Sequence, residues 1–83
     1  MPVVAVVDGV RIKVYANDHP PPHFHAEFAE HRAVIHIRTL QVAKGSLPEA
    51  KRRTVIDWAA SRQAALLEAY LRAIAKQSVR PLE

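Results

Sequence analysis

The sequence contains no cysteine, and this absence excludes several kinds of chemistry. Without a thiol among the 83 residues, disulfides, thiolate catalysis and cysteine-based zinc fingers are excluded, whereas metal sites built from histidine and carboxylate remain open. The chain also lacks a Gly-rich phosphate loop, a serine-centred triad and any apolar run near the roughly 20 residues of a membrane span. We therefore expect no membrane contact, and chemistry carried by histidine and charged side chains.

The first apolar stretch lacks the features of a secretory signal. No Lys or Arg precedes it, and it meets Asp8-Gly9 after only a few residues, too soon for the apolar core of a signal peptide. We therefore expect a cytoplasmic protein. Twelve Lys/Arg against eight Asp/Glu give a formal net charge of +4, which permits an anionic partner without requiring one.

The length predicts one small domain over residues 1–83. A chain of this size buries roughly 60 to 65% of its unfolded surface, so its core benefits from a partner, and we expect a homo-oligomer or a small partner protein. Within the domain, residues 1–44 are expected to form a sheet interrupted by a His-Pro-rich connector. Residues 46–77 are expected to form the helical part.

Two β-rich runs around Asp8-Gly9 predict a first hairpin. This pair is typical of a type I′ turn between two strands. Pairing Val7 with Val10 puts the apolar alternate side chains on one face, with Val3 opposite Val14. The other face then carries Arg11, Lys13 and Tyr15.

A stiff connector and a second hairpin follow. Residues 16–22 include three consecutive prolines, which cannot donate to a β ladder. Residues 23–28 and 33–38 both alternate apolar with polar side chains, which indicates two strands joined by a turn near residues 29–32. A short fifth strand is expected over residues 40–43.

The register of the second hairpin is predicted from the phases of its apolar residues. Phe24 should lie opposite Ile37 for both apolar faces to meet one core, and this pairing places His25 opposite His36. The face away from the core then carries a cluster of polar side chains. They are His23, His25, Glu27, His36 and Arg38, with Arg11 and Lys13 of the first hairpin.

The second half of the chain predicts helix. Ser46 followed by Glu49 has the capping-box form, and Pro48 is tolerated in a first helical turn. Apolar residues then recur at helical spacing from Ile56 onward. Ser61 is a candidate break, so one long helix and two helices are both open. The fold class is thus α+β: a four- or five-stranded antiparallel sheet of two hairpins, with one face covered by a C-terminal helix or helix pair.

All five histidines lie between residues 19 and 36, and three uses of the polar face compete. A metal site would combine His23 and His25 with Glu27 or His36, a donor set that zinc or iron accepts. A metal-free RNA-cleaving site would use one neutral and one protonated histidine as base and acid, with Arg38, Arg11 or Lys13 stabilising the phosphorane. A binding surface would hold RNA or other phosphates. Its residues would be Arg11, Lys13, Arg38 and His36.

Simpler interpretations stand beside these. Histidines on the open face of a sheet are often only solvated polar residues. The prolines act as a brace between the hairpins, and Trp58 acts as a core or interface anchor. Whether the protein is an enzyme is left open by the residues alone.

The run from Asn17 to Ala26, Asn-Asp-His-Pro-Pro-Pro-His-Phe-His-Ala, resembles a known family. It is similar to the bacterial domain-of-unknown-function family four-one-six-zero, whose small members are typified by N-D-H-x-P-P-H-F-H-A. Asp8-Gly9, the Gly45-x-Leu47-Pro48 segment and Trp58 also match, so the resemblance spans nearly the whole chain. Members usually have a glycine in the turn near Ala29-Glu30, and this chain has none there.

The resemblance implies a component of a toxin-antitoxin-like gene pair, acting on or binding RNA or a partner protein through the His-rich face. It raises His19, His23 and His25 above His36 as catalytic candidates. The alternative is a divalent-metal-binding protein or metal-dependent hydrolase, with zinc as the example, using these three histidines with Glu27 or Asp18. A purely structural partner is the third hypothesis. The motif residues expected to have structural roles are Asn17, Pro21, Pro22, Phe24 and Trp58.

Overall fold

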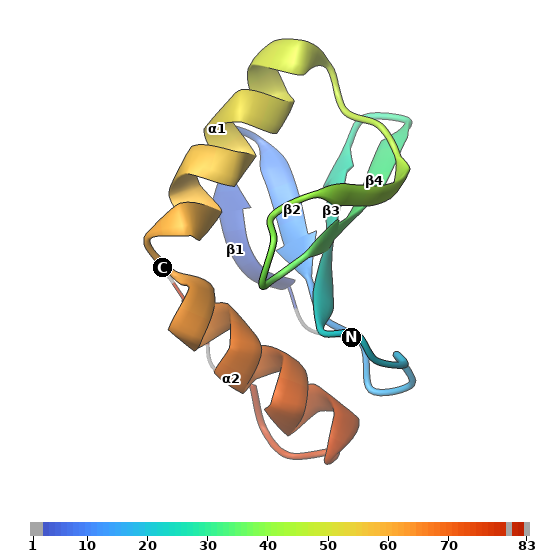
Figure 1. The fold of residues 1–83 in the computed structure, drawn as a ribbon, viewed down its shortest axis with the longest axis vertical. Helices are drawn as coiled ribbons and strands as arrows, with labels where there is room; N and C mark the ends of the chain where they lie inside the picture. Colours follow the sequence, from blue (N-terminus) through green and yellow to red (C-terminus); the bar gives the residue numbers. More distant parts are fainter. Residues whose placement is uncertain (1–2, 80, 83) are drawn as a thin grey trace.

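The computed structural model describes residues 3–79 and 81–82, and shows a five-stranded sheet followed by two helices (Figure 1). The strands are β1 (Val3–Val7), β2 (Val10–Lys13), β3 (His23–Phe28), β4 (His31–His36) and β5 (Val42–Gly45), and the helices are α1 (Glu49–Ala60) and α2 (Gln63–Ile74). Neighbouring strands are antiparallel, and their order in the sheet follows the chain. The predicted α+β class is confirmed, with five strands and a helix pair.

The first hairpin forms around the predicted turn. Asp8 and Gly9 both have positive φ angles, of 51° and 80°, as a type I′ turn requires, and Val7 pairs with Val10. The predicted pairing of Val3 is wrong. A bulge between Val3 and Ala5 shifts Val3 opposite Lys13 and leaves its side chain 40% exposed, because the extra residue turns the strand end away from the core.

The predicted register of the second hairpin is wrong by two residues. Phe24 pairs with Ile35 and His25 with Val34, so His36 lies opposite His23. The cause is a shorter turn, since β4 begins at His31 and Ala29 takes a φ angle of +52°. A shift of two residues preserves the faces, so Phe24 and Ile35 are still buried in the core.

The helical part begins later than predicted. Pro48 is the N-cap residue of α1, and no side chain caps the helix, so the capping-box prediction is wrong. Glu49 instead binds Arg52, with 2.6 Å between Oε2 and Nη2, and the Ser46 N–H donates to the Arg32 carbonyl at 3.0 Å, extending the pairing of β5 with β4. The helix pair breaks at Ser61 and Arg62.

Both helices lie on the same side of the sheet, and the core fills the space between (Figure 1). Its largest fully buried side chains come from both layers: Phe24, Ile12, Ile35 and Ile37 from the sheet region, and Tyr70, Leu66 and Val55 from the helices. Trp58 is partly buried and packs against this core, as its predicted role as an anchor requires. No helix of the described residues is both long and apolar enough to cross a membrane.

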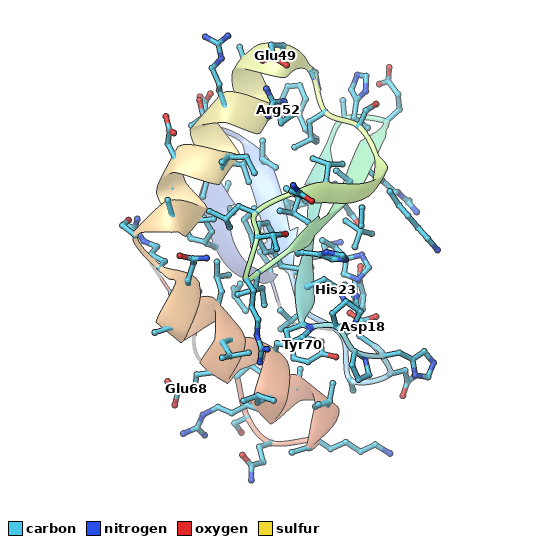
Figure 2. All side chains as sticks on the ribbon, in the orientation of Figure 1. Asp18, His23, Glu49, Arg52, Glu68 and Tyr70 are labelled. Atoms are coloured by element: carbon cyan, nitrogen blue, oxygen red, sulfur yellow. The ribbon has the colours of Figure 1, made fainter. Side chains whose placement is uncertain are left out.

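Helix α2 is attached to the end of β4 and runs past the start of β3. The Gln63 side-chain amide donates to the carbonyls of Ile37 and Arg38, at 2.8 and 3.0 Å. From there α2 runs below the sheet in Figure 1, toward the connector. This course brings Tyr70 next to His23, at the end of the sheet where the histidine motif lies (Figure 2).

Candidate metal centre

The connector carries Asp18 back over the start of β3. A turn after β2 brings the Asp18 N–H within 3.4 Å of the Tyr15 carbonyl, and the prolines then lead into β3, with a cis bond between Pro20 and Pro21. The Pro22 carbonyl accepts a hydrogen bond from the Ile37 N–H at 3.0 Å. The proline segment is thereby fixed to the end of β4, and Asp18 is held above the histidine side chains.

Two imidazole rings converge on one carboxylate oxygen. The Oδ2 atom of Asp18 lies 2.9 Å from the Nε2 atom of His25 and 3.2 Å from the Nε2 atom of His23. One ligand atom from each of the three side chains lies within 4.8 Å of the others. The side chains are sheltered but open to solvent, with exposed fractions of 17% for Asp18, 14% for His23 and 24% for His25.

The hydrogen bonds of His23 define the role of each ring nitrogen. Its Nδ1 atom lies 2.8 Å from the carbonyl oxygen of Pro21; since a carbonyl only accepts, Nδ1 carries a proton and donates it. Its Nε2 atom then faces the Asp18 carboxylate, which is also only an acceptor. Two acceptors at 3.2 Å need a proton or a cation between them. Metal-binding histidines are oriented in this way, with the second nitrogen held by a carbonyl.

Two tyrosines enclose the triad of Asp18, His23 and His25. The ring of Tyr15 meets His25 edge-on, with 4.5 Å between centroids, and the ring of Tyr70 lies 5.7 Å from that of His23. Tyr70 is only 1% exposed, and its buried hydroxyl has no hydrogen-bond partner among the described residues. Burial and the nearby Asp18 charge raise the pKa of Tyr70, so it is a neutral donor next to the triad.

Two of the three separations between ligand atoms fit the size of a tetrahedral site, and the ligand atoms of the two histidines lie within 4.8 Å of each other. With bonds of about 2.0 to 2.1 Å to zinc, tetrahedral ligand atoms lie about 3.3 Å apart. The distances from Asp18 Oδ2 to the two histidine Nε2 atoms, 2.9 and 3.2 Å, are within a few tenths of an ångström of this value. Three protein ligands also leave one position for water or substrate.

Glu27, a predicted metal ligand, has other partners. Its Oε1 atom lies 2.9 Å from the Lys13 ammonium and 3.5 Å from an Arg11 nitrogen, and the Tyr15 hydroxyl donates to Oε2 at 3.4 Å. The hydrogen bond from Lys13 is the main cause that lowers the pKa of Glu27. Glu27 is therefore an ionised carboxylate within an ion-pair network, and Asp18 takes the place next to the histidines.

The other predicted site residues lie outside the triad. His19 is exposed in the connector, as are Asn17 and Arg38 in their loops, and His36 lies opposite His23 on β4 but is not part of the triad. Sequence reasoning named Asp18 only as an alternative and did not assign Tyr70 to the site. The position of Asp18 inside the His-Pro motif could have identified it as a site residue from the sequence. The place of Tyr70 at the site depends on the course of α2, which the sequence does not show.

Replacing Glu27 with glutamine is expected to lower the free energy of unfolding by about 1 to 3 kcal/mol at neutral pH, because charged hydrogen bonds are lost. The pKa of Glu27 is lowered in the folded state from 4.5, so its charge stabilises the fold above that pH. The contribution disappears as the pH falls through the folded-state pKa. Urea unfolding at neutral and acidic pH measures this, and the two proteins should converge in acid.

Glu68→Gln is the control for this experiment, because Glu68 is exposed and pairs with Arg72 only on the surface of α2, at 3.2 Å. Exposed ion pairs contribute little to stability, so the free energy of unfolding is expected to change by no more than about 0.5 kcal/mol at every pH. An equal effect of both substitutions would contradict the role given to the Glu27 network.

Comparison with known proteins gives one family. The sequence model of a family described as a domain of unknown function (DUF4160) matches residues 9–70. This range contains the whole triad and Tyr70. No curated protein and no solved structure gives a match to the chain.

Proposed function

The chain belongs to the DUF4160 family, and within this family of unknown function we propose that it binds one divalent metal ion of the zinc class through Asp18, His23 and His25. The observation that carries the proposal is the convergence of two imidazole Nε2 atoms on one carboxylate oxygen, at 2.9 and 3.2 Å. The Pro21 carbonyl orients His23, and the buried Tyr70 hydroxyl lacks a partner among the described residues.

The donor set favours hydrolytic chemistry. Two imidazoles and one carboxylate leave a position open on zinc, and a metal in such a site makes bound water a nucleophile near neutral pH. In this protein, His23 and His25 would hold the metal from β3, and Asp18 would close the site from the connector. The Tyr70 hydroxyl, which lacks a partner among the described residues, would be a neutral donor for a ligand in the open position.

The predicted RNA-binding surface receives less support than the metal site. Of its four residues, Arg11 and Lys13 are both directed to Glu27, whose single negative charge compensates one of their two positive charges. A role in a toxin-antitoxin-like module, with RNA or a small partner protein, stays a prediction from the sequence. The homo-oligomer and the cytoplasmic address stay predictions too.

Elemental mass spectrometry of tag-free protein, dialysed after incubation with zinc, tests the proposal directly. We expect about one metal ion per chain in the wild-type protein, and less than about a tenth of that after His23→Ala with His25→Ala, because one carboxylate alone does not hold zinc. Circular dichroism should show that the double variant still folds.

The matched control is His19→Ala with His31→Ala, which removes two histidines that lie outside the triad. This variant should keep its metal. A wild-type protein without metal, or a control that loses as much as the triad variant, would reject the proposed site.

A further inference from the structure

A hollow of about 400 Å³ lies on the same sheet face as the triad, and His25 belongs to both. It spans β3, β4 and β5. The side chains that line it are Tyr15, His25, Glu27, Arg32, Val34 and Lys44. Anything bound in this hollow would therefore be next to the open position of the proposed metal site.

The strand pairing places Arg32 and Lys44, the two cations of the hollow, close to each other and to His25. His25 lies opposite Val34, and Val34 lies opposite Lys44, so these three form one row across β3, β4 and β5. Arg32 lies opposite Glu27, two residues along the strands from that row. With strands about 4.8 Å apart, the Lys44 backbone is about 10 Å from that of His25, within reach of one ligand.

A glycine keeps β5 close to β4 at this point. Gly45 has a φ angle of +71°, and a Cβ atom there would collide with the Arg32 carbonyl. The next residue, Ser46, donates its N–H to that same carbonyl at 3.0 Å. Lys44 and Arg32 are thereby held on tightly paired strands, at one end of the hollow.

The charges around the hollow are unequal. Glu27 is the acidic side chain in its lining, and Lys13 and Arg11 already compensate its charge. Arg32 and Lys44 are exposed, and neither forms an ion pair or a side-chain hydrogen bond within the described part of the chain. The charge of Arg32 acts on Glu27, opposite it in the sheet, and helps to lower its pKa. Because Lys13 and Arg11 already bind that carboxylate, the cations still exceed the acidic groups around the hollow, and this excess favours an anion there.

We propose that the hollow binds the phosphate group of a small phosphate ester, held by Arg32 and Lys44 with its ester bond toward the metal triad. Arginine suits phosphate because its planar fork matches the phosphate oxygens. This inference rests on the proposed metal centre, and it gives that centre a substrate class. In the hydrolysis, a water oxygen bonds to phosphorus, the bond to the ester oxygen breaks, and a water proton passes to the departing alcohol.

The dimensions favour a small ester over a nucleic-acid strand. A volume of about 400 Å³ lies within the range of small-molecule sites, roughly 300 to 1,000 Å³. A strand would need a track of cations matching successive phosphates. Arg11 and Lys13 are directed to Glu27, and the lining of the hollow itself offers one pair of cations, Arg32 and Lys44.

Phenyl phosphate binding to zinc-loaded protein, followed by NMR shift titration, tests the inference. The variant Arg32→Gln with Lys44→Gln should bind at least about tenfold more weakly, because two charged contacts are lost. Arg53→Gln with Lys76→Gln removes the same charge from exposed positions in α1 and after α2. This control should bind like the wild-type protein. Zinc content is measured on every sample.

The outcomes separate the two proposals. Normal zinc content with equal phenyl phosphate affinity in the hollow variant and the wild type would overturn this inference while the metal site stands. Absence of zinc from the wild type would overturn the proposed function. In that case, loss of binding in the hollow variant of metal-free protein would still support the anion site. Tighter binding of a short single-stranded RNA, lost in the same variant, would contradict the small-ester assignment.

Discussion

Phe24→Ala is expected to lower the free energy of unfolding by about 3 to 5 kcal/mol. Phe24 is fully buried in β3, opposite Ile35, and α2 packs against the same strand. Truncation removes most of a large apolar side chain and leaves a cavity between sheet and helix. Since the total free energy of unfolding of a native protein is only about 5 to 15 kcal/mol, a large part of the stability would be lost. Urea unfolding followed by Trp58 fluorescence measures the change.

Val6→Ala is the control, because it also removes apolar atoms from a strand but at a side chain that is 60% exposed. A change within about 0.5 kcal/mol is expected for a surface substitution of this kind. If the two variants were destabilised equally, Phe24 could not occupy the buried position that the structure gives it.

Zinc is expected to raise the melting temperature of the wild-type protein by about 10 °C or more at a concentration 100 times the dissociation constant. A ligand that binds only the folded state at that excess stabilises it by about 2.7 kcal/mol, and each kcal/mol corresponds to at least about 4 °C in a domain of this size. The triad of Asp18, His23 and His25 joins the connector to β3, so it exists only in the folded chain. Differential scanning calorimetry with and without zinc measures the shift.

Asp18→Asn should abolish most of this shift, because the amide is a far poorer zinc ligand than the carboxylate. Asp57→Asn, at an exposed position of α1, should leave the shift unchanged. Equal zinc shifts in both variants would mean that the metal acts elsewhere.

The faces of the strands could be predicted from the sequence, but the register of β3 and β4 could not. Alternation with a period of two decides which side chains point to the core, and this part of the prediction is confirmed for Phe24 and Ile35. Register depends on the turn. Ala29 adopts a positive φ angle that alanine rarely takes, so nothing in the sequence marked a turn shorter than residues 29–32.

The candidate site was predictable in part, for a similar reason. His23 and His25 follow from the motif and from alternation, and both are in the triad. Alternation also puts Glu27 on their face, but it does not show that Lys13 on β2 lies within 2.9 Å of it. Tyr70 belongs to an apolar helical stripe, which predicts burial. That its hydroxyl ends next to the site depends on where α2 passes the sheet.

The side chains of β3 alternate between two roles. Those on one face, such as Phe24, pack in the core, and the triad histidines lie on the other face. This alternation limits where insertions and deletions can occur in evolution. One residue inserted between His23 and Phe28 would exchange the faces beyond it, sending histidine inward or phenylalanine outward. A change of length within β3 therefore disrupts either the packing of the core or the metal triad.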